Sequence, residues 1–347
     1  MTNDEALDKA LREIEKSYGK GTVGMLGDDS VYIDIETVPT GSFSLDMALG
    51  KGMPLGRLAE VFGPEGSGKT TVALHIVAEA QKKIPDKKCM FIDAEHVLDR
   101  DLAREYSVDI KNLLFSQPSY GEQTLDICEK AISSGKVSIV VVDSVAALIP
   151  KAELEGEMED KHIGTTARIM SQGLKKLSAV CAKNQATIIF VNQVREKVGI
   201  MFGNPETTPG GRSLKFYASV RLEVRRGKPI EREVDGAKEQ VGHNVNFNVV
   251  KNKLAPPFKK GSFPLIYGRG IDMAEEMINI GTALGVLEQK GAYYYYKDKK
   301  WQGREGARNG IKEEGFIEEI RSQIVNGLDG NEQEEQEQQQ EEEGAEE

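Results

Sequence analysis

Gly63-Pro64-Glu65-Gly66-Ser67-Gly68-Lys69-Thr70 decides the fold of this 347-residue chain. The octet follows the apolar run 58–62 and precedes residues 71–83, whose apolar positions have helical spacing. It matches G-x-x-x-x-G-K-[ST], in which glycines let backbone N–H groups converge on phosphate oxygens at the positive end of a helix. The Lys69 ammonium would neutralise phosphate charge, and the Thr70 hydroxyl would bind Mg²⁺. The octet therefore predicts a phosphate-binding loop, with a Gly-rich turn before a helix as the alternative.

Apolar, strand-like segments alternate with helical segments on both sides of the loop. We expect strands at 58–62, 89–93, 113–115, 137–143 and 187–192, and helices at 44–49, 71–83, 122–133, 165–183 and from residue 99. This alternation is typical of a parallel sheet covered by helices on both faces. Segments 218–225 and 244–250 lie between polar turns and indicate an antiparallel extension. The expected fold class is therefore α/β with a mixed, mainly parallel sheet.

The N-terminal segment differs from this core. Residues 3–18 have apolar positions at helical spacing among many charged residues, which predicts an amphipathic helix. The apolar face of this helix is expected to pack against another apolar surface. The spacing leaves open whether that surface belongs to the core of the same chain or to a neighbouring copy. The residues that follow are loop-like, with one short strand expected near Val31–Ile35.

The C-terminal segment forms a further region. After Gly270, helical patterns at 273–281 and 310–324 surround Tyr293–Tyr296 and indicate a second, smaller domain. The Gln/Glu run from Glu332 cannot offset its ordering entropy by burial, so we expect it to be disordered. The predicted organisation is an N-terminal arm at 1–32, a core at 33–269, a C-terminal domain at 270–330 and a disordered acidic tail at 331–347.

Composition excludes few partners. The formal net charge is −11, but residues 331–347 carry nine Glu and no Lys or Arg, so removing these nine charges leaves −2. A nearly neutral body can carry local basic surfaces. Three widely spaced cysteines in apolar surroundings indicate buried thiols in a reducing compartment. No apolar run approaches the ~20 residues of a membrane span, so we expect a soluble, cytoplasmic protein with no membrane partner.

Three polar side chains are expected at the edge of the sheet that carries the phosphate-binding loop. Asp143 ends an apolar strand and could hold Mg²⁺ near Thr70, although a strand-terminating cap would look the same. Glu95 lies just beyond a strand end and could orient or deprotonate water, or be a surface carboxylate. Gln193 also follows a strand, where an uncharged amide could sense the γ-phosphate.

Two further segments have compositions that suit a nucleic-acid contact. Residues 194–212 form a basic, Gly-rich stretch with apolar wedges, expected to lack regular structure, as suits single-stranded nucleic acid. A hairpin cap or a flexible lid would look similar. Residues 152–164 are mostly acidic but lead into Arg168, Ser171 and Lys175, which share one helix face. Those three could contact a phosphate backbone together or form a solvated face.

Several runs, in order along nearly the whole chain before the tail, resemble the bacterial RecA recombinases. They are the octet 63–70, Phe91–His96, Ile139–Leu148, Met201–Thr208, Leu214–Arg221 and Val249–Lys253. The resemblance implies a P-loop (RecA-like) ATPase core with an N-terminal helix arm and a small α+β C-terminal domain. It also implies a protein that uses ATP and Mg²⁺.

The same resemblance implies a function in recombinational DNA repair. It implies a filament on single-stranded DNA that pairs with homologous double-stranded DNA and exchanges strands, with DNA-dependent ATP hydrolysis. A further implied activity is stimulation of the self-cleavage of a LexA-type repressor in the SOS response to DNA damage.

The resemblance assigns roles at the nucleotide site. Glu95 is the implied catalytic carboxylate, Lys69 contacts the phosphates, and Gln193 senses the γ-phosphate and couples ATP to the loops. Thr70 and Asp143 are the implied Mg²⁺ ligands. The implied ATP-binding residues are Gly63, Pro64, Glu65, Gly66, Ser67, Gly68, Lys69, Thr70, Thr71, Asp99 as an adenine contact, and Lys251 and Lys253, which reach the ATP of the adjacent protomer.

Contacts with DNA and with other subunits follow from the same resemblance. It places Phe216 at the subunit interface and the N-terminal helix on the neighbouring core, with Val198 as a wedge between base triplets. Backbone-directed contacts leave the bases free to pair with a second strand. The implied DNA-binding residues are Ile163, Arg168, Ser171, Lys175, Arg195, Lys197, Val198, Thr207, Gly210, Gly211 and Arg212.

Three positions depart from the family pattern. Leu102 stands where an aromatic commonly stacks on adenine, so base packing there would be apolar only. Asn246 and Asn248 stand where basic residues often serve the secondary site for duplex DNA. If that site exists here, its charge must come from elsewhere, such as Lys297, Lys299 and Lys300.

Two other function classes are weighed against recombination. A ring-forming ATPase motor on the same core, such as a replicative DNA helicase, is the alternative, and the order and identity of the loop residues favour the recombinase. A passive single-strand-binding module would leave Lys69, Glu95 and Asp143 without a role.

The acidic tail yields a test at the level of the sequence. A tethered polyanion competes with DNA for basic surfaces, so deletion of Asn331–Glu347 is expected to ease duplex binding and lower its Mg²⁺ requirement. Duplex affinity measured across a Mg²⁺ titration checks this, and identical curves for the full-length and shortened chains would contradict it.

Overall fold

The computed structural model describes residues 3–19, 22–25, 35–156, 164–196, 206–234 and 237–327. The chain divides after Glu36 into two compact units. The first contains α1 (Asn3–Tyr18), the predicted amphipathic helix, on which Leu7 is 57% exposed. The strand predicted near Val31–Ile35 lies outside the described residues except for Ile35, which is not in a strand, and the predicted tail at 331–347 also lies outside them.

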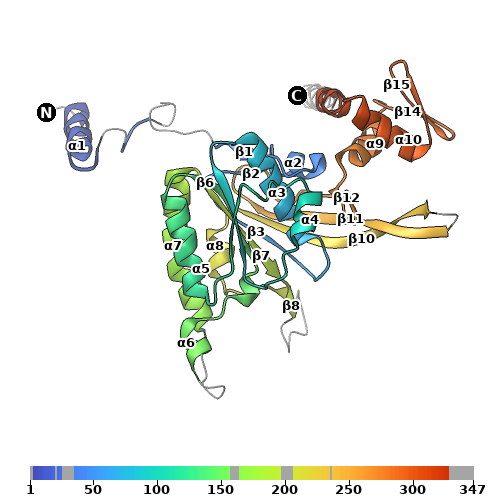
Figure 1. Ribbon diagram of the computed structural model, residues 1–347. Coiled ribbons are helices and arrows are strands. Elements are labelled where there is room, and N and C mark those ends of the chain that lie inside the picture. The colour runs from blue at the N-terminus through green and yellow to red at the C-terminus, as the bar shows by residue number, and fades with distance from the viewer. Residues whose placement is uncertain are drawn as a thin grey trace, which may run out of the picture. The chain divides into compact units, whose positions relative to one another are not determined.

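The second unit is built on a sheet with nine strands among the described residues (Figure 1). Their order is β13 (Gly270–Ile271), β12 (Lys260–Ile266), β11 (Ala237–Asn252), β10 (Val220–Val234), β3 (Leu58–Gly63), β7 (Thr187–Gln193), β6 (Val137–Asp143), β4 (Lys88–Asp93) and β5 (Leu113–Ser116). Neighbours from β10 to β5 are parallel, and those from β10 to β13 are antiparallel. The predicted mixed, mainly parallel sheet is confirmed.

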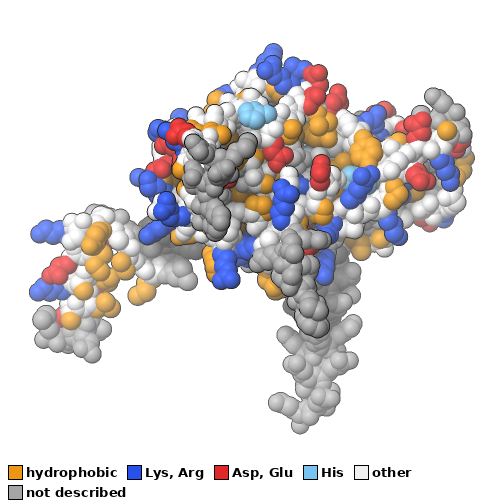
Figure 2. Space-filling model, turned by 90° about the horizontal axis from the view of Figure 1, so that it is seen from below, with side chains coloured by type: hydrophobic (Ala, Val, Ile, Leu, Met, Phe, Trp, Pro, Cys, Tyr) orange, Lys and Arg blue, Asp and Glu red, His pale blue; other side chains and the backbone are white. Residues whose placement is uncertain are grey.

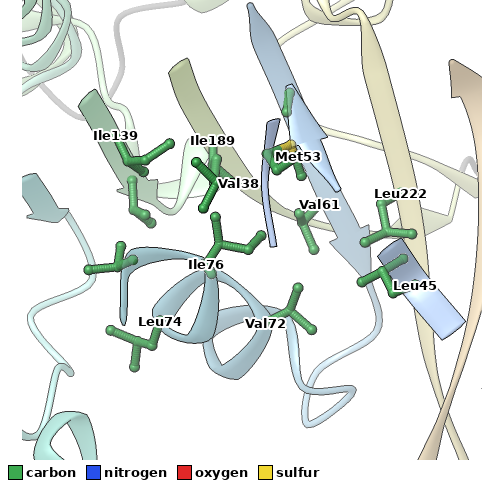
Figure 3. Packing of buried hydrophobic residues seen from close by; sticks show 14 of the residues in the cluster. Val38, Leu45, Met53, Val61, Val72, Leu74, Ile76, Ile139, Ile189 and Leu222 are labelled. Atoms are coloured by element: carbon green, nitrogen blue, oxygen red, sulfur yellow. The ribbon is translucent and has the colours of Figure 1, made fainter. Parts of the chain in front are cut away.

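Helices cover both faces of this sheet (Figure 1). One face packs against α2 (Phe43–Leu49), α3 (Lys69–Lys83) and α4 (Arg100–Glu105), and the other against α5 (Gly121–Ser133), α7 (Thr165–Asn184) and α8 (Ser213–Tyr217). Successive residues of a strand alternate between the two layers, so Ile189 packs in the α3 layer and Ile188 in the α7 layer. Figure 3 shows Ile189 and Val61 facing Ile76 and Val72 of α3.

This two-sided burial explains why the strand sequences are continuously apolar. Every residue of β6 is buried, including Asp143 at its end. Full burial of one Val, Ile or Leu side chain contributes about 1.5–3 kcal/mol. The sheet therefore rests on apolar contacts from both layers, and the polar ends of its strands are free to serve a site.

Short elements frame the predicted loops. A 3₁₀ turn, η1 (Val145–Ala147), and α6 (Lys151–Glu155) follow β6, so the segment predicted as a loop at 152–164 begins as a helix. The prediction that 194–212 lacks regular structure is wrong at its ends, because β8 (Arg195–Glu196) pairs antiparallel with β9 (Glu206–Thr207). A second short pair, β1 (Thr37–Val38) with β2 (Met53–Pro54), lies before β3.

The C-terminal part carries its own apolar cluster. It contains α9 (Met273–Ala283), the antiparallel strands β14 (Glu288–Lys290), β15 (Tyr293–Tyr296) and β16 (Lys299–Gln302), α10 (Gly303–Glu313), and helical residues 317–327. The single helix predicted at 310–324 is wrong, because Gly315 adopts a left-handed conformation and breaks it in two. The domain boundary at residue 270 remains a prediction.

A buried carboxylate, that of Glu276, connects α9 to the start of α2. Glu276 of α9 accepts hydrogen bonds from the Ser42 hydroxyl (3.0 Å) and from the backbone N–H groups of Phe43 (3.0 Å) and Ser44 (2.7 Å). Nearby, Asp46 accepts from the Thr40 N–H at 2.7 Å. Burial raises the pKa of Glu276 and raises that of Asp46 to about 6. The C-terminal part is thus attached to the core through Glu276, a carboxylate that is costly to ionise.

The described helices include none with both the length and the apolar character that crossing a bilayer requires.

Asp46 supplies a test of these buried charges. Its folded-state pKa of about 6 exceeds the ordinary 3.8, so its contribution to stability is fully present below pH 3.8 and is lost as pH rises to about 6. A shift of this size costs up to about 3 kcal/mol at neutral pH. Asp46→Asn, which keeps an acceptor for Thr40, is therefore expected to be more stable than wild type at pH 7.5, by a margin that narrows at pH 5.

Urea unfolding of the nucleotide-free proteins at the two pH values measures this effect. Asp86→Asn, at an exposed position, is the matched control and is expected to change stability little at either pH. Equal stability of Asp46→Asn and wild type at pH 7.5 would contradict the assignment.

Candidate functional site

The strand register brings the predicted catalytic segments to one edge of the sheet. Gly63 of β3 pairs with Gln193 of β7, and Asp143 of β6 pairs with both Val191 of β7 and Asp93 of β4. These pairs all lie at the carboxyl ends of parallel strands, which is where ligands bind in open α/β sheets.

The predicted phosphate-binding loop connects β3 directly to α3. Gly68 adopts the left-handed conformation at φ 91° immediately before α3 begins at Lys69. Gly63 has no room for a side chain, because a Cβ atom there would lie 1.9 Å from the carbonyl oxygen of Val224. The sequence therefore needs glycine at both positions to bring the loop backbone into the helix N-terminus.

The loop presents groups that suit a phosphate. The Lys69 ammonium donates to the Pro64 carbonyl oxygen at 2.7 Å, so the cation folds back over the loop. The buried Ser67 hydroxyl has no hydrogen-bond partner among the described residues. A phosphate group would give the Ser67 hydroxyl an acceptor and Lys69 a charged partner.

Thr70 and Asp143 are joined by a hydrogen bond. The Thr70 hydroxyl donates to Asp143 Oδ2 at 2.6 Å. Burial raises the pKa of Asp143 to about 6, while the Thr70 bond opposes the rise. Burial also lowers the pKa of Lys69, and the Asp143 carboxylate opposes that change. Without a cation nearby, the buried Asp143 carboxylate is costly to ionise, and the charge of Mg²⁺ would favour its ionised form. A carboxylate beside a hydroxyl is therefore a suitable pair of ligands for Mg²⁺.

Glu95 lies in contact with two donors. Its Oε1 accepts from the Gln193 side-chain amide at 3.2 Å and from the Ser144 hydroxyl. The structure thus brings two predicted residues, Glu95 and Gln193, together. Ser144 was missed by the sequence reasoning, although its place directly after Asp143 was the available signal.

The predicted adenine contact lies at the end of a small cavity that begins at the phosphate loop. Asp99 caps α4 and accepts from the backbone N–H groups of Asp101 (2.7 Å) and Leu102 (3.0 Å), bonds that lower its pKa. The cavity, of about 70 Å³, includes Thr70, Thr71, Leu74, Asp99, Leu102 and Tyr106 in its lining. Asp99 therefore lies within reach of a ligand that starts at Thr70.

The predicted DNA residues on α7 are accessible together. Arg168, Ser171 and Lys175 are all exposed, on one face of a helix that spans Thr165–Asn184. Figure 2 shows Lys and Arg side chains distributed over the face of the molecule that it views. The helix thus offers two cations and a hydroxyl at one surface.

The predicted residues at the end of the second loop lie beside α7. A Cβ atom on Gly211 would lie 2.9 Å from the Ala167 side chain, and one on Gly210 would lie 2.8 Å from Val145. Arg212 is exposed, and Arg195 pairs with Thr207 across β8 and β9. The structure therefore brings the end of the second loop, at Gly210 and Gly211, close to α7, the helix that carries Arg168, Ser171 and Lys175. Of the predicted residues, Ile163, Lys197 and Val198 lie outside the described parts.

Lys251 and Lys253 are not brought to the phosphate loop of their own chain. The Lys253 N–H donates to the Ser219 carbonyl, and the Ser219 N–H donates to the carbonyl of Leu58, the first residue of β3. Lys253 therefore lies near the level of Leu58 in the sheet. Leu58 precedes Gly63 by five residues, which is about 16 Å along β3. Lys251 donates to the carbonyl oxygens of Lys215 (2.7 Å) and Phe216 (2.9 Å), and burial lowers its pKa.

A buried polar network beneath Gln193 was also missed. The Asn192 side-chain amide donates to Glu60 Oε1 at 2.9 Å and to the Pro209 carbonyl at 3.0 Å. Glu60, fully buried, accepts from the Arg221 guanidinium at 2.6 Å. Asn192 precedes the predicted sensor in sequence, and this adjacency was the only available signal, because the partners come from strands distant in sequence.

One position that departs from the family pattern, and the lysines suggested as replacement charge, have local partners. Asn248 donates to Glu223 at 3.2 Å. Lys297 and Lys299 form ion pairs with Glu319 and Glu314. Lys300 lies over the Tyr293 ring, 4.2 Å from its centroid. Of the three lysines suggested as replacement charge, two are therefore partly neutralised within the C-terminal part.

Comparison with known proteins agrees with this arrangement. A family model described as the RecA N-terminal domain matches residues 5–272, and one described as the RecA C-terminal domain matches residues 275–329. The chain is 52% identical over 323 residues to Protein RecA of Heliobacterium modesticaldum, covering 92% of each chain. It is 51% identical over 333 residues to Protein RecA of Bacillus subtilis, covering 94% of this chain and 93% of the relative. The chain therefore belongs to the RecA family.

Proposed function

We propose that this chain is an ATP-dependent DNA recombinase. It forms a filament on single-stranded DNA, pairs that strand with homologous double-stranded DNA and exchanges strands, with DNA-dependent ATP hydrolysis. The observation that carries the proposal is the hydrogen bond between Gln193 and Glu95, because it joins the hydrolytic carboxylate to the residue from which the second loop begins. Activation of a LexA-type repressor in the SOS response, and a cytoplasmic location, are proposed from membership of the family.

Binding of ATP begins at the loop 63–70. The backbone N–H groups and the α3 N-terminus hold the phosphates, and Lys69 turns from the Pro64 carbonyl to the β- and γ-phosphates. Mg²⁺, when bound, would spread the phosphate charge and orient the γ-phosphate. Thr70 and Asp143 would hold it.

Hydrolysis requires a base beside the γ-phosphate. Glu95 Oε1 is oriented by Ser144 and Gln193 and would accept the proton of the attacking water. Gln193 has a single amide, so turning it toward the γ-phosphate withdraws one donor from Glu95. This exchange would leave the carboxylate a stronger proton acceptor, since a donor to the charged form stabilises that form.

The same exchange would connect nucleotide binding with DNA binding. Gln193 lies two residues before Arg195 and β8, and the other end of this loop returns at Pro209 beside α7. Movement of Gln193 toward the nucleotide would therefore shift the start of the loop relative to its anchored exit and to Arg168, Ser171 and Lys175. ATP would act as a switch for DNA affinity, and hydrolysis would be the release step.

Contacts to the DNA would be made mainly to its backbone. The accessible groups on α7 and at the loop exit are cations, a hydroxyl and glycine N–H groups, which bind phosphates without reading sequence. The bases would then remain available for pairing, as a homology search requires. Such binding depends on the release of counterions and is expected to weaken with salt.

Self-assembly is supported by two surfaces. Phe216 is 72% exposed beside the Lys251 ammonium. At the far edge of the sheet, the edge strand β5 exposes Leu114 (43%) and Phe115 (48%). We propose that Lys251 and Lys253 contact the ATP of the adjacent protomer, a head-to-tail contact that generates either a ring or a filament. Shared ATP would stabilise the interface by linkage.

The filament is tested by electron microscopy with single-stranded DNA and a slowly hydrolysed ATP analogue. Wild type is expected to form open helical filaments and to join strands in a strand-exchange assay with ATP. Glu95→Gln should bind ATP and DNA but lose hydrolysis at least about a hundredfold, and its DNA complexes should persist. Lys69→Ala should lose both nucleotide binding and strand joining. Closed six-membered rings would overturn the proposal in favour of a helicase-like motor.

The shared ATP site is tested by mixing two inactive variants. Lys69→Ala removes the phosphate contact in one protomer, and the double change Lys251→Ala with Lys253→Ala removes the contact from its neighbour. Each variant alone should lose most of its DNA-dependent ATPase activity. An equimolar mixture should regain a measurable fraction, because some interfaces then combine an intact loop with intact lysines. A mixture no more active than its components would count against a shared site.

A further inference from the structure

The base end of the nucleotide cavity is lined by a tyrosine with no assigned role. Tyr106 ends α4 one helical turn beyond Leu102, and both side chains line the cavity. Leu102 occupies the position where an aromatic was expected, and it is 37% exposed, whereas Tyr106 is 5% exposed. Tyr106, four residues after Leu102, therefore supplies the aromatic surface that Leu102 lacks.

The Tyr106 ring packs on a histidine of the phosphate-binding helix. Its centroid lies 5.3 Å from that of His75 on α3, with 24° between the ring planes. His75 Nε2 accepts the backbone N–H of Ile271 at 2.9 Å. Burial lowers the pKa of His75 to about 4, so the imidazole is neutral at physiological pH and Nε2 can accept. Three segments distant in sequence thus meet at one imidazole.

The contact between His75 and residues 270–271 leaves no spare room. A Cβ atom on Gly270 would lie 2.1 Å from His75 Nε2 and 2.9 Å from the Tyr106 ring. Gly270 also has a positive φ of 75°. Ile271 directly precedes Asp272, which caps α9, the helix that carries Glu276. A change in the position of Ile271 therefore changes the start of α9.

We propose that Tyr106 and His75 connect the base of a bound purine nucleotide to the start of α9. This inference rests on the proposed ATP site. A purine in the cavity restricts the Tyr106 ring, the ring fixes the His75 imidazole, and the imidazole holds the Ile271 amide. By reciprocity, an Ile271 amide that is held favours nucleotide binding. Tyr106 is a base-packing residue, and His75 is a positioning residue that acts through Tyr106.

Hydrogen exchange of the full-length chain separates the base from the phosphates. Two ligands are compared: a non-hydrolysed ATP analogue, and inorganic tripolyphosphate with Mg²⁺, which has no base. Both are expected to slow exchange at the start of α3. Only the ATP analogue is expected to slow exchange in the peptide covering 267–273, by at least about threefold. Equal effects of the two ligands at 267–273 would overturn the proposal.

Two variants of His75 test the connection itself. His75→Gln keeps an acceptor for the Ile271 N–H but has no ring to stack on Tyr106. It should keep basal protection at 267–273 and lose the response to the base. His75→Leu should lose both. In each variant, tripolyphosphate should still slow exchange at α3, which shows that the phosphate site is intact. A base response that survives in both variants would refute the role of His75.

Tyr106 is tested by steady-state kinetics. Tyr106→Leu is expected to raise the KM for ATP by about two- to tenfold, the range for loss of an aromatic packing partner, with a much smaller change in kcat. Tyr106→Phe retains the ring and should behave like wild type. A KM unchanged in Tyr106→Leu would overturn its role as a base-packing residue. If neither ligand slows hydrogen exchange at the start of α3 in the wild-type chain, the ATP site itself would be refuted, and the connection to α9 with it.

Discussion

Parallel register is the constraint on which the rest of the structure depends. Because β3, β7, β6 and β4 run in one direction and end at one level, the loop after Gly63, the amide of Gln193 and the carboxylate of Asp143 arrive at the same edge. That register is held by side chains that alternate between two apolar layers, so a slip of one residue would exchange the layers. The chemistry at the edge is thus fixed by packing far from it.

A buried charge stands behind this edge. Glu60 is fully buried and is satisfied by Arg221 and Asn192. A buried ion pair contributes little net stability, but removing one partner leaves an uncompensated charge. Asn192 also binds the Pro209 carbonyl, so the exit of the second loop is attached to the interior of the sheet and not only to its own hairpin. The loop is therefore anchored at a point that cannot shift without breaking several buried hydrogen bonds.

The sequence was sufficient to predict most of the core and several polar side chains that lie at its edge. Continuous apolar strands and the loop pattern predicted the α/β sheet, and strand-end positions predicted Glu95, Asp143 and Gln193. Contacts between distant segments could not be predicted: the Asn192 network, the Ser144 donor and the β8–β9 pair depend on register, which local spacing does not contain. The break at Gly315 was missed because helical periodicity continues across it, and only the positive φ interrupts the helix.

The hydrogen bond between Lys69 and Pro64 has a consequence for the exchange of nucleotides. The Lys69 ammonium donates to the Pro64 carbonyl oxygen of its own loop, so the loop itself offers this cation an acceptor. A phosphate would replace that neutral acceptor with a charged one, which forms the stronger hydrogen bond. The ammonium could therefore pass between a phosphate and the loop carbonyl without losing its hydrogen bond, which would lower the cost of releasing one nucleotide and binding the next.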